Sequence, residues 1–124
     1  MNWDQLREVS RQGITVGSHT HSHPVLATLD AGNQKEELSL SKRVIERQVG
    51  LPVRSLAYPV GGPEHFTNDT KSIAQQCGYG AAFSYGTGLN QWGRIDPYNI
   101  RRISTDGSGM QIAATMALPG LFLG

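Results

Sequence analysis

Apolar side chains recur at helical spacing in several stretches of the chain. Near the N-terminus, Trp3, Leu6 and Val9 are each three residues apart and fall on one face of a predicted helix. Asn2 can cap the beginning of this helix, and Gly13 can end it. Three further helices are predicted from similar signals: from Asn33 to Gly50, from Asn68 or Asp69 to Gly78, and onward from Ser108.

Short apolar runs stand between these helices and predict strands. The four predicted strands are ITVGSH at residues 14–19, SLAYP at 55–59, AAFSY at 81–85 and IRRIS at 100–104. Helices that alternate with strands are typical of a mainly parallel sheet with the helices packed outside it. The pattern therefore predicts an α/β fold.

The composition indicates one globular domain. The chain has 124 residues, of which 38% are hydrophobic and 17% charged, so it can bury a core and is not expected to be disordered. A closed eight-stranded α/β barrel typically needs about 250 residues, so any barrel here is partial. With a formal net charge of +1 and no basic cluster, we expect neither a nucleic-acid nor a membrane partner.

The cysteine content and the N-terminal residues bear on location. The single cysteine, Cys77, excludes an internal disulfide framework. The N-terminal residues show no charged-then-apolar leader pattern, and nowhere do about 18 apolar residues run together. The chain as given is therefore expected to be cytoplasmic, while the compartment of any parent protein stays open.

Three of the 4 histidines lie within five consecutive positions, in GSHTHSHP at residues 17–24. On an extended strand, His19, His21 and His23 point to the same face. On a helix, His19 and His23 still lie together at a spacing of four. Because imidazole is a common ligand of zinc and similar ions, the cluster indicates a divalent-metal site at the end of a strand. A merely polar loop and a three-histidine site that includes His21 are the alternatives.

The histidine run and a later segment resemble a known family. HTHSHP is similar to a motif of the polysaccharide deacetylases (the NodB homology domain), in which histidine and serine or threonine are followed, two residues later, by histidine and proline. LAYPVGG at residues 56–62 is similar to their later strand-end motif. The resemblance covers residues 3–104. It implies a partial (β/α) barrel, as a single domain over residues 1–124 that is incomplete at its N-terminus.

The resemblance also implies a reaction and its site residues. In that family a divalent metal, often zinc, is held by two histidines and an aspartate, and the enzymes hydrolyse acetyl groups from N- or O-acetylated carbohydrates. Carried over by motif, His19 and His23 are the metal ligands, and the backbone N–H of Val60 is a catalytic donor to the oxyanion. The predicted sugar-contacting residues are Tyr58, Pro59 and Trp92. For the two aromatic residues, ordinary packing is the alternative.

The chain departs from the family pattern at several positions. The family carries an aspartate pair, the base and the third metal ligand, on a strand upstream of the histidines, whereas Asp4 here lies in a predicted helix. Ala57 stands where an arginine that orients the base often stands. We therefore expect a metal-dependent carbohydrate deacetylase with little or no activity in this chain alone. A non-catalytic deacetylase-like module for carbohydrate binding or assembly is the alternative.

An incomplete barrel also predicts self-association. Without a first strand, the sheet leaves a long edge unpaired, and the apolar segment ALPGLFLG at residues 117–124 offers further surface to bury. Exposed sheet edges tend to pair with other chains. We therefore expect a dimer or a larger homo-oligomer.

Overall fold

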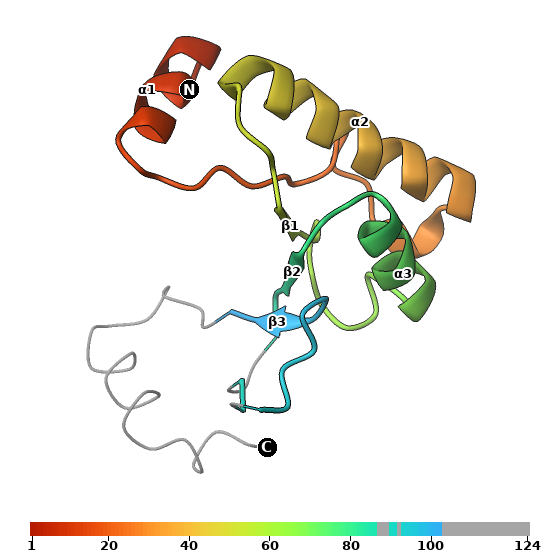
Figure 1. Cartoon of the computed structure of the whole chain (residues 1–124). Coiled ribbons are helices and arrows are strands. Elements are labelled where there is room, and N and C mark those ends of the chain that lie inside the picture. The colour runs from red at the N-terminus through yellow and green to blue at the C-terminus, as the bar shows by residue number, and fades with distance from the viewer. Residues whose placement is uncertain (87–89, 92, 103–124) are drawn as a thin grey trace.

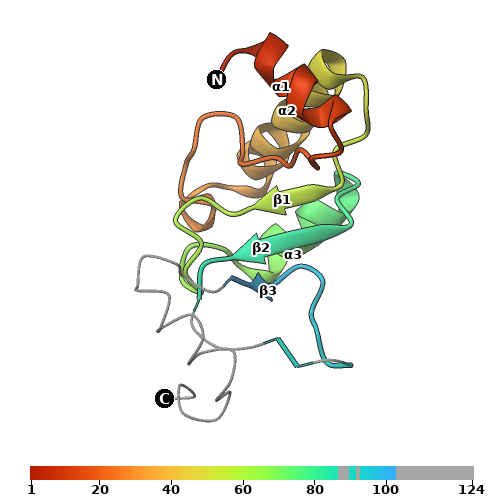
Figure 2. The ribbon, with the colours of Figure 1, turned by 90° about the vertical axis from the view of Figure 1, so that its left-hand side faces the viewer.

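The computed structural model of the chain describes residues 1–86, 90–91 and 93–102. Within this part, one sheet contains the strands β1 (Ser55–Ala57), β2 (Ala81–Ser84) and β3 (Ile100–Arg101). The strands are parallel and lie in the order β1-β2-β3. Figure 2 shows the three arrows one below the next, all pointing the same way. The predicted α/β fold with a parallel sheet is confirmed.

The larger helices lie on one side of the sheet, and α2 is the longest of those described (Figures 1 and 2). The helical elements are α1 (Trp3–Arg11), the short 3-10 helix η1 (Leu26–Thr28), α2 (Ala31–Val49) and α3 (Asn68–Gln76). Helix α2 packs against both α1 and α3 (Figure 1). Asn2 caps α1 as predicted, and Gly50 ends α2 with a φ of 73°, a backbone conformation that glycine adopts without strain.

One helix start differs from the sequence prediction, and another agrees with it. Helix α2 begins at Ala31, because the carboxylate of Asp30 accepts the N–H of Asn33 and so caps the helix three residues before the predicted cap at Asn33. Helix α3 begins at Asn68, as predicted, and the Thr67 side chain caps it by accepting the N–H of Thr70. The helix predicted onward from Ser108 lies outside the described residues. In the described part of the chain, no helix has the length and apolar character needed to cross a membrane.

The first predicted strand, residues 14–19, is wrong as a strand, because only Ser18 pairs with β1 and it does so through an isolated parallel bridge. The Ser18 N–H donates to the carbonyl of Ser55, and the Ala57 N–H donates to the carbonyl of Ser18, both at 2.9 Å. Within the described residues no strand lies on the outer side of this segment, so pairing stops there. The parallel direction is kept, and the histidines still follow at the carboxyl end of the sheet.

The core lies between the sheet and helices α2 and α3. Its buried apolar residues are Leu26, Leu38, Val53, Leu56, Tyr58, Phe66, Ile73, Ala74, Tyr79 and Ala82. Leu26 lies just after residues 19–24, and Leu56 and Tyr58 lie in β1 and directly after it, so both segments lead into the core.

Candidate functional site

His19 and His23 face each other in the loop that follows Ser18. Their Nε2 atoms are 3.1 Å apart, and their ring centroids are 4.8 Å apart with the planes inclined by 73°. In Figure 2 the orange segment that carries this loop lies at the arrowhead end of β1. The predicted convergence of the two imidazoles at the carboxyl end of the sheet is therefore present.

The backbone brings the two rings together by a turn, not by a strand or a helix. Thr20 and His23 adopt positive φ values of 67° and 61°, which L-residues with side chains seldom do. The His23 N–H donates to Thr20 Oγ1 at 3.1 Å, so Thr20 buttresses the turn. His21 does not join the pair: among the described residues, no three His, Cys, Asp or Glu side chains could hold one ion. The three-histidine alternative is wrong.

The carbonyl of Ala57 holds the ring of His19. The Nδ1 atom of His19 lies 2.8 Å from this carbonyl oxygen. Because a carbonyl only accepts hydrogen bonds, Nδ1 carries the proton, and the lone pair of the neutral ring is on Nε2, which faces His23. Metal-ligating histidines commonly donate their other ring N–H to a carbonyl or carboxylate in this way.

The spacing of the two rings fits adjacent positions around a divalent ion. With zinc–nitrogen bonds of about 2.0 to 2.1 Å, two bound nitrogens are about 2.9 Å apart at a right angle and about 3.3 Å apart at the tetrahedral angle. The 3.1 Å between the Nε2 atoms lies between these values. Both residues are exposed, so an ion could reach them, but the described residues bring no third His, Cys, Asp or Glu side chain to them.

Glu37, on α2, also contacts the histidine loop, and sequence analysis did not single it out. Its Oε2 atom accepts the N–H groups of His21 and Ser22 at 2.9 and 2.8 Å, and its Oε1 atom accepts the Ser22 hydroxyl at 2.6 Å. Burial alone would raise the pKa of Glu37, but these hydrogen bonds outweigh it and lower the pKa. The partners are 15 and 16 residues away in the chain, so no local motif signals the contact.

Val60 lies at the centre of a tight turn after β1. Its φ is 60°, and the Gly61 N–H donates to the carbonyl of Pro59 at 2.5 Å, which closes a three-residue turn. In the described chain, three residues other than glycine have a positive φ, and they are Thr20, His23 and Val60. Its own N–H meets no acceptor among the described residues. This N–H is therefore available for the predicted donation to an oxyanion.

Replacing Val60 with glycine is expected to raise the free energy of unfolding by about 1 kcal/mol. Backbone strain of this kind costs about 1–3 kcal/mol, and glycine relieves it while adding about 0.5–1 kcal/mol of chain entropy. Little packing is lost, because the Val60 side chain is 52% exposed. Urea denaturation measures the change. Val25, whose φ is −72°, provides the control, since Val25→Gly should destabilise the fold. An equal loss of stability in both variants would contradict the strain.

The predictions of Tyr58 and Pro59 as sugar contacts are wrong. Tyr58 is fully buried and stacks on Phe66 with ring centroids 4.2 Å apart, and its hydroxyl donates to the carbonyl of Tyr98 at 2.9 Å. Burial raises the pKa of the Tyr58 hydroxyl far above its usual value. Pro59 is buried as well, so neither side chain has a free face. Ordinary packing, the alternative for Tyr58, is confirmed, and Trp92 lies outside the described residues.

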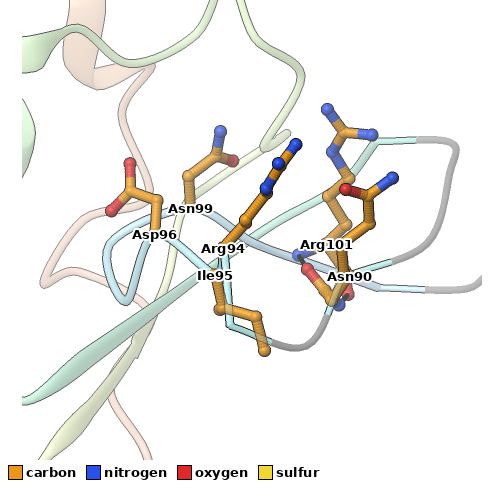
Figure 3. Close-up of a pocket in the computed structure, with 7 residues that line it drawn as sticks. Asn90, Arg94, Ile95, Asp96, Asn99 and Arg101 are labelled. Carbon is orange, nitrogen blue, oxygen red and sulfur yellow. Dashed lines mark hydrogen bonds between the residues drawn. The ribbon is translucent and has the colours of Figure 1, made fainter.

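A hollow of about 330 Å³ lies on the loop between β2 and β3. In Figure 3, Asp96 and Asn99 lie on one side of it and Asn90 and Arg101 on the other, with Arg94 between. The Asn90 side chain exchanges two hydrogen bonds with the backbone of Arg101, and Asp96 pairs with a lysine at 2.8 Å. Neither imidazole of the histidine pair lines this hollow, so it is separate from the candidate metal site.

A parallel sheet flanked by helices, with paired histidines in a turn at the carboxyl ends of its strands, defines an α/β protein that holds its site in the loops after the strands. The family model described as polysaccharide deacetylase matches residues 1–82. The chain belongs to the polysaccharide deacetylase family, as its two motifs predicted.

Known relatives agree with this assignment. YxkH of Bacillus subtilis (strain 168), which is named as a polysaccharide deacetylase, is 29% identical over 76 residues, covering 61% of this chain and 26% of that protein. A polysaccharide deacetylase from Bacillus cereus has the same fold, with a TM-score of 0.79 at 24% identity over 94% of this chain and 36% of that one. A CE4 family pseudoenzyme from Bacillus anthracis aligns with a TM-score of 0.58 at 25% identity, over 65% of this chain and 28% of its own. The matched region is thus about a quarter to a third of each of these proteins.

Proposed function

We propose that this chain carries the histidine side of a metal-dependent centre that removes acetyl groups from N- or O-acetylated carbohydrates. The observation that carries the proposal is the pair of Nε2 atoms 3.1 Å apart, with the His19 ring held by the Ala57 carbonyl. Family membership supports the deacetylase reaction. The match to YxkH covers 26% of that protein. Deacetylase activity in any longer protein that contains this chain is therefore also part of the proposal.

In the proposed centre, His19 and His23 bind a divalent ion, most simply zinc, through their Nε2 atoms. When bound, such an ion polarises the acetyl carbonyl and lowers the pKa of a water to about 7 in favourable zinc sites. The Ala57 carbonyl keeps the His19 ring in the tautomer that leaves Nε2 free to bind. The N–H of Val60 donates to the oxyanion that develops on the acetyl group, a contact worth about 2.7–4 kcal/mol in analogous reactions.

The described residues alone are proposed to support at most weak turnover. Two imidazoles are fewer protein ligands than the three that catalytic zinc sites commonly have, and within the described chain no Asp or Glu joins them. Hydrolysis also needs a group that takes a proton from the attacking water. A segment that supplies a carboxylate at the carboxyl end of the sheet would provide both.

Acetate release by the zinc-loaded chain tests the proposal. The substrates are N-acetylated chito-oligosaccharides and O-acetylated xylo-oligosaccharides, which separate the two kinds of acetyl group. A slow release that depends on zinc and disappears in His19→Ala supports the deacetylase function. A complete absence of release from both substrates, with zinc bound, argues against activity in this chain.

A non-catalytic carbohydrate-binding or assembly module is the second candidate. It is favoured by the likeness to a CE4 family pseudoenzyme, which aligns over 65% of this chain with a TM-score of 0.58. Titration calorimetry with the same two oligosaccharides distinguishes the candidates. Binding without acetate release, unchanged in His19→Ala, supports the module.

Self-association through the outer edge of the sheet is also proposed. In the described part of the chain no strand pairs with the outer side of residues 14–17, and the Ile14 side chain is 57% exposed. Ile14 also lines an adjoining hollow of about 310 Å³ with Val49 and Leu51.

Light scattering of the chain at concentrations of tens of micromolar should detect a dimer or larger species, and Ile14→Lys should shift it towards monomer. Gln12→Lys is the control, because it also introduces a lysine, at an exposed position outside residues 14–17. A wild-type chain that is monomeric at these concentrations contradicts the proposal.

A further inference from the structure

Glu37 fixes the backbone between the two candidate ligands through three hydrogen bonds. Its carboxylate accepts the N–H groups of His21 and Ser22 at 2.9 and 2.8 Å and the Ser22 hydroxyl at 2.6 Å. Hydrogen bonds to an ionised acceptor are shorter and stronger than those between neutral groups. All three donors lie between His19 and His23 in the chain, so these bonds hold the segment that joins the two rings.

Helix α2 holds the histidine loop at a second point. One turn beyond Glu37, the hydroxyl of Ser41 hydrogen-bonds the hydroxyl of Ser18, and both side chains are buried. Ser18 directly precedes His19. The helix itself is anchored by Leu38, which is fully buried in the core. One rigid element thus fixes the chain just before His19 and again just before His23.

The loop depends on such contacts because part of its backbone is strained. Thr20 and His23 both have positive φ values, and conformations of this kind persist only where the surrounding structure enforces them. The imidazoles of His19 and His23 are exposed, so packing of the rings contributes little. In the described chain, Glu37 supplies the hydrogen bonds that join residues 20–23 to α2.

We propose that Glu37 is a positioning residue for the metal centre. It holds the loop so that His23 lies where one ion can bind both imidazoles, and it does not touch the ion itself. This inference rests on the proposed function, in which His19 and His23 are the ligands. A merely structural Glu37 would change only the stability of the fold. A positioning Glu37 changes the contact between the rings and the affinity for metal in a protein that is still folded.

Zinc affinity in Glu37→Ala, measured against a chromophoric chelator, is the first test. Glu36→Ala is the matched control, because Glu36 is the next residue of α2, is exposed, carries the same charge, and its carboxylate accepts no hydrogen bond from the described residues. Loss of groups that orient a metal ligand typically costs 10–100-fold in affinity, so we expect a loss of about this size in Glu37→Ala and a change below about twofold in Glu36→Ala. Thermal melting without zinc shows that both variants are folded.

The ring contact in the metal-free protein is the second test. A nuclear Overhauser effect between the His19 and His23 rings should be present in the wild type and in Glu36→Ala and lost in Glu37→Ala. Ser22→Ala, which keeps the two backbone hydrogen bonds to Glu37, should retain most of the contact. If Glu37→Ala does not fold, Glu37→Gln takes its place, because the amide keeps one acceptor oxygen and should give an intermediate loss.

The outcomes separate this inference from the proposed function. A folded Glu37 variant with wild-type zinc affinity and an intact ring contact overturns the positioning role. A wild-type chain that binds no zinc contradicts the proposed metal centre, whereas the ring contact still decides whether Glu37 positions the loop. A chain that binds zinc and releases no acetate contradicts the deacetylase activity alone, and zinc affinity then decides the role of Glu37.

Discussion

Replacing His19 with alanine is expected to lower the zinc affinity of the chain by more than about 100-fold, since even residues that only orient a ligand account for 10–100-fold. The Nε2 atoms of His19 and His23 are the two donors that the described residues bring together, 3.1 Å apart. Removal of one leaves a single imidazole, which has no chelating partner. Competition with a chromophoric chelator at neutral pH measures the affinity, and His23→Ala should give a loss of the same size.

His21→Ala is the control for this experiment, because His21 is the same residue type, is exposed and lies between the two ligands. Its backbone N–H, which bonds to Glu37, survives the substitution. Zinc affinity should therefore remain close to that of the wild type. If His21→Ala lost as much affinity as His19→Ala, the ion would be bound by a different set of histidines from the pair proposed here.

Replacing Tyr58 with alanine is expected to lower the free energy of unfolding by about 3–5 kcal/mol, the usual cost of removing a buried aromatic side chain. Tyr58 is fully buried, stacks on Phe66 and donates its hydroxyl to the carbonyl of Tyr98. The variant loses the ring contact and leaves that carbonyl without this donor. Since many domains of this size are stable by only about 5–15 kcal/mol, the loss is a large share of the total.

Tyr58→Phe is the matched variant, since it keeps the ring and removes only the hydroxyl. It should cost about 0.5–1.5 kcal/mol, the usual net contribution of one hydrogen bond. Urea denaturation followed by circular dichroism gives both values. A stable Tyr58→Ala that instead loses affinity for acetylated oligosaccharides would restore Tyr58 as a sugar contact and contradict its place in the core.

The parts of the fold that depend on neighbours in sequence were predictable. The cap at Asn2 and the end of α2 at Gly50 use contacts within a few residues, and both are present as expected. The start of α2 was misplaced, because Asp30 and Asn33 are both good caps and sequence alone does not rank them. The parallel direction of the sheet followed from the alternation of helices and strands.

The two candidate ligands could be picked out from the sequence, but the geometry that brings them together could not. The spacing of His19 and His23 indicated that their rings would meet, but the turn that joins them depends on positive φ at Thr20 and His23, which no residue there signals as glycine would. The support from Glu37 arises only when α2 packs beside the loop. The sequence left Tyr58 open between a sugar contact and ordinary packing, because its burial is likewise a tertiary effect.

The two anchors on α2 tie the register of the helix to the geometry of the histidine loop. Glu37 and Ser41 are four positions apart, about one helical turn, and contact the two ends of the same short loop. A single-residue insertion between them would rotate one anchor by about 100° relative to the other, so one end of the loop would lose its support. Changes of length in this family should therefore be tolerated in the connections around α2 and not within that turn. In this chain, the length of one turn of α2 therefore helps to fix the spacing of the two histidines.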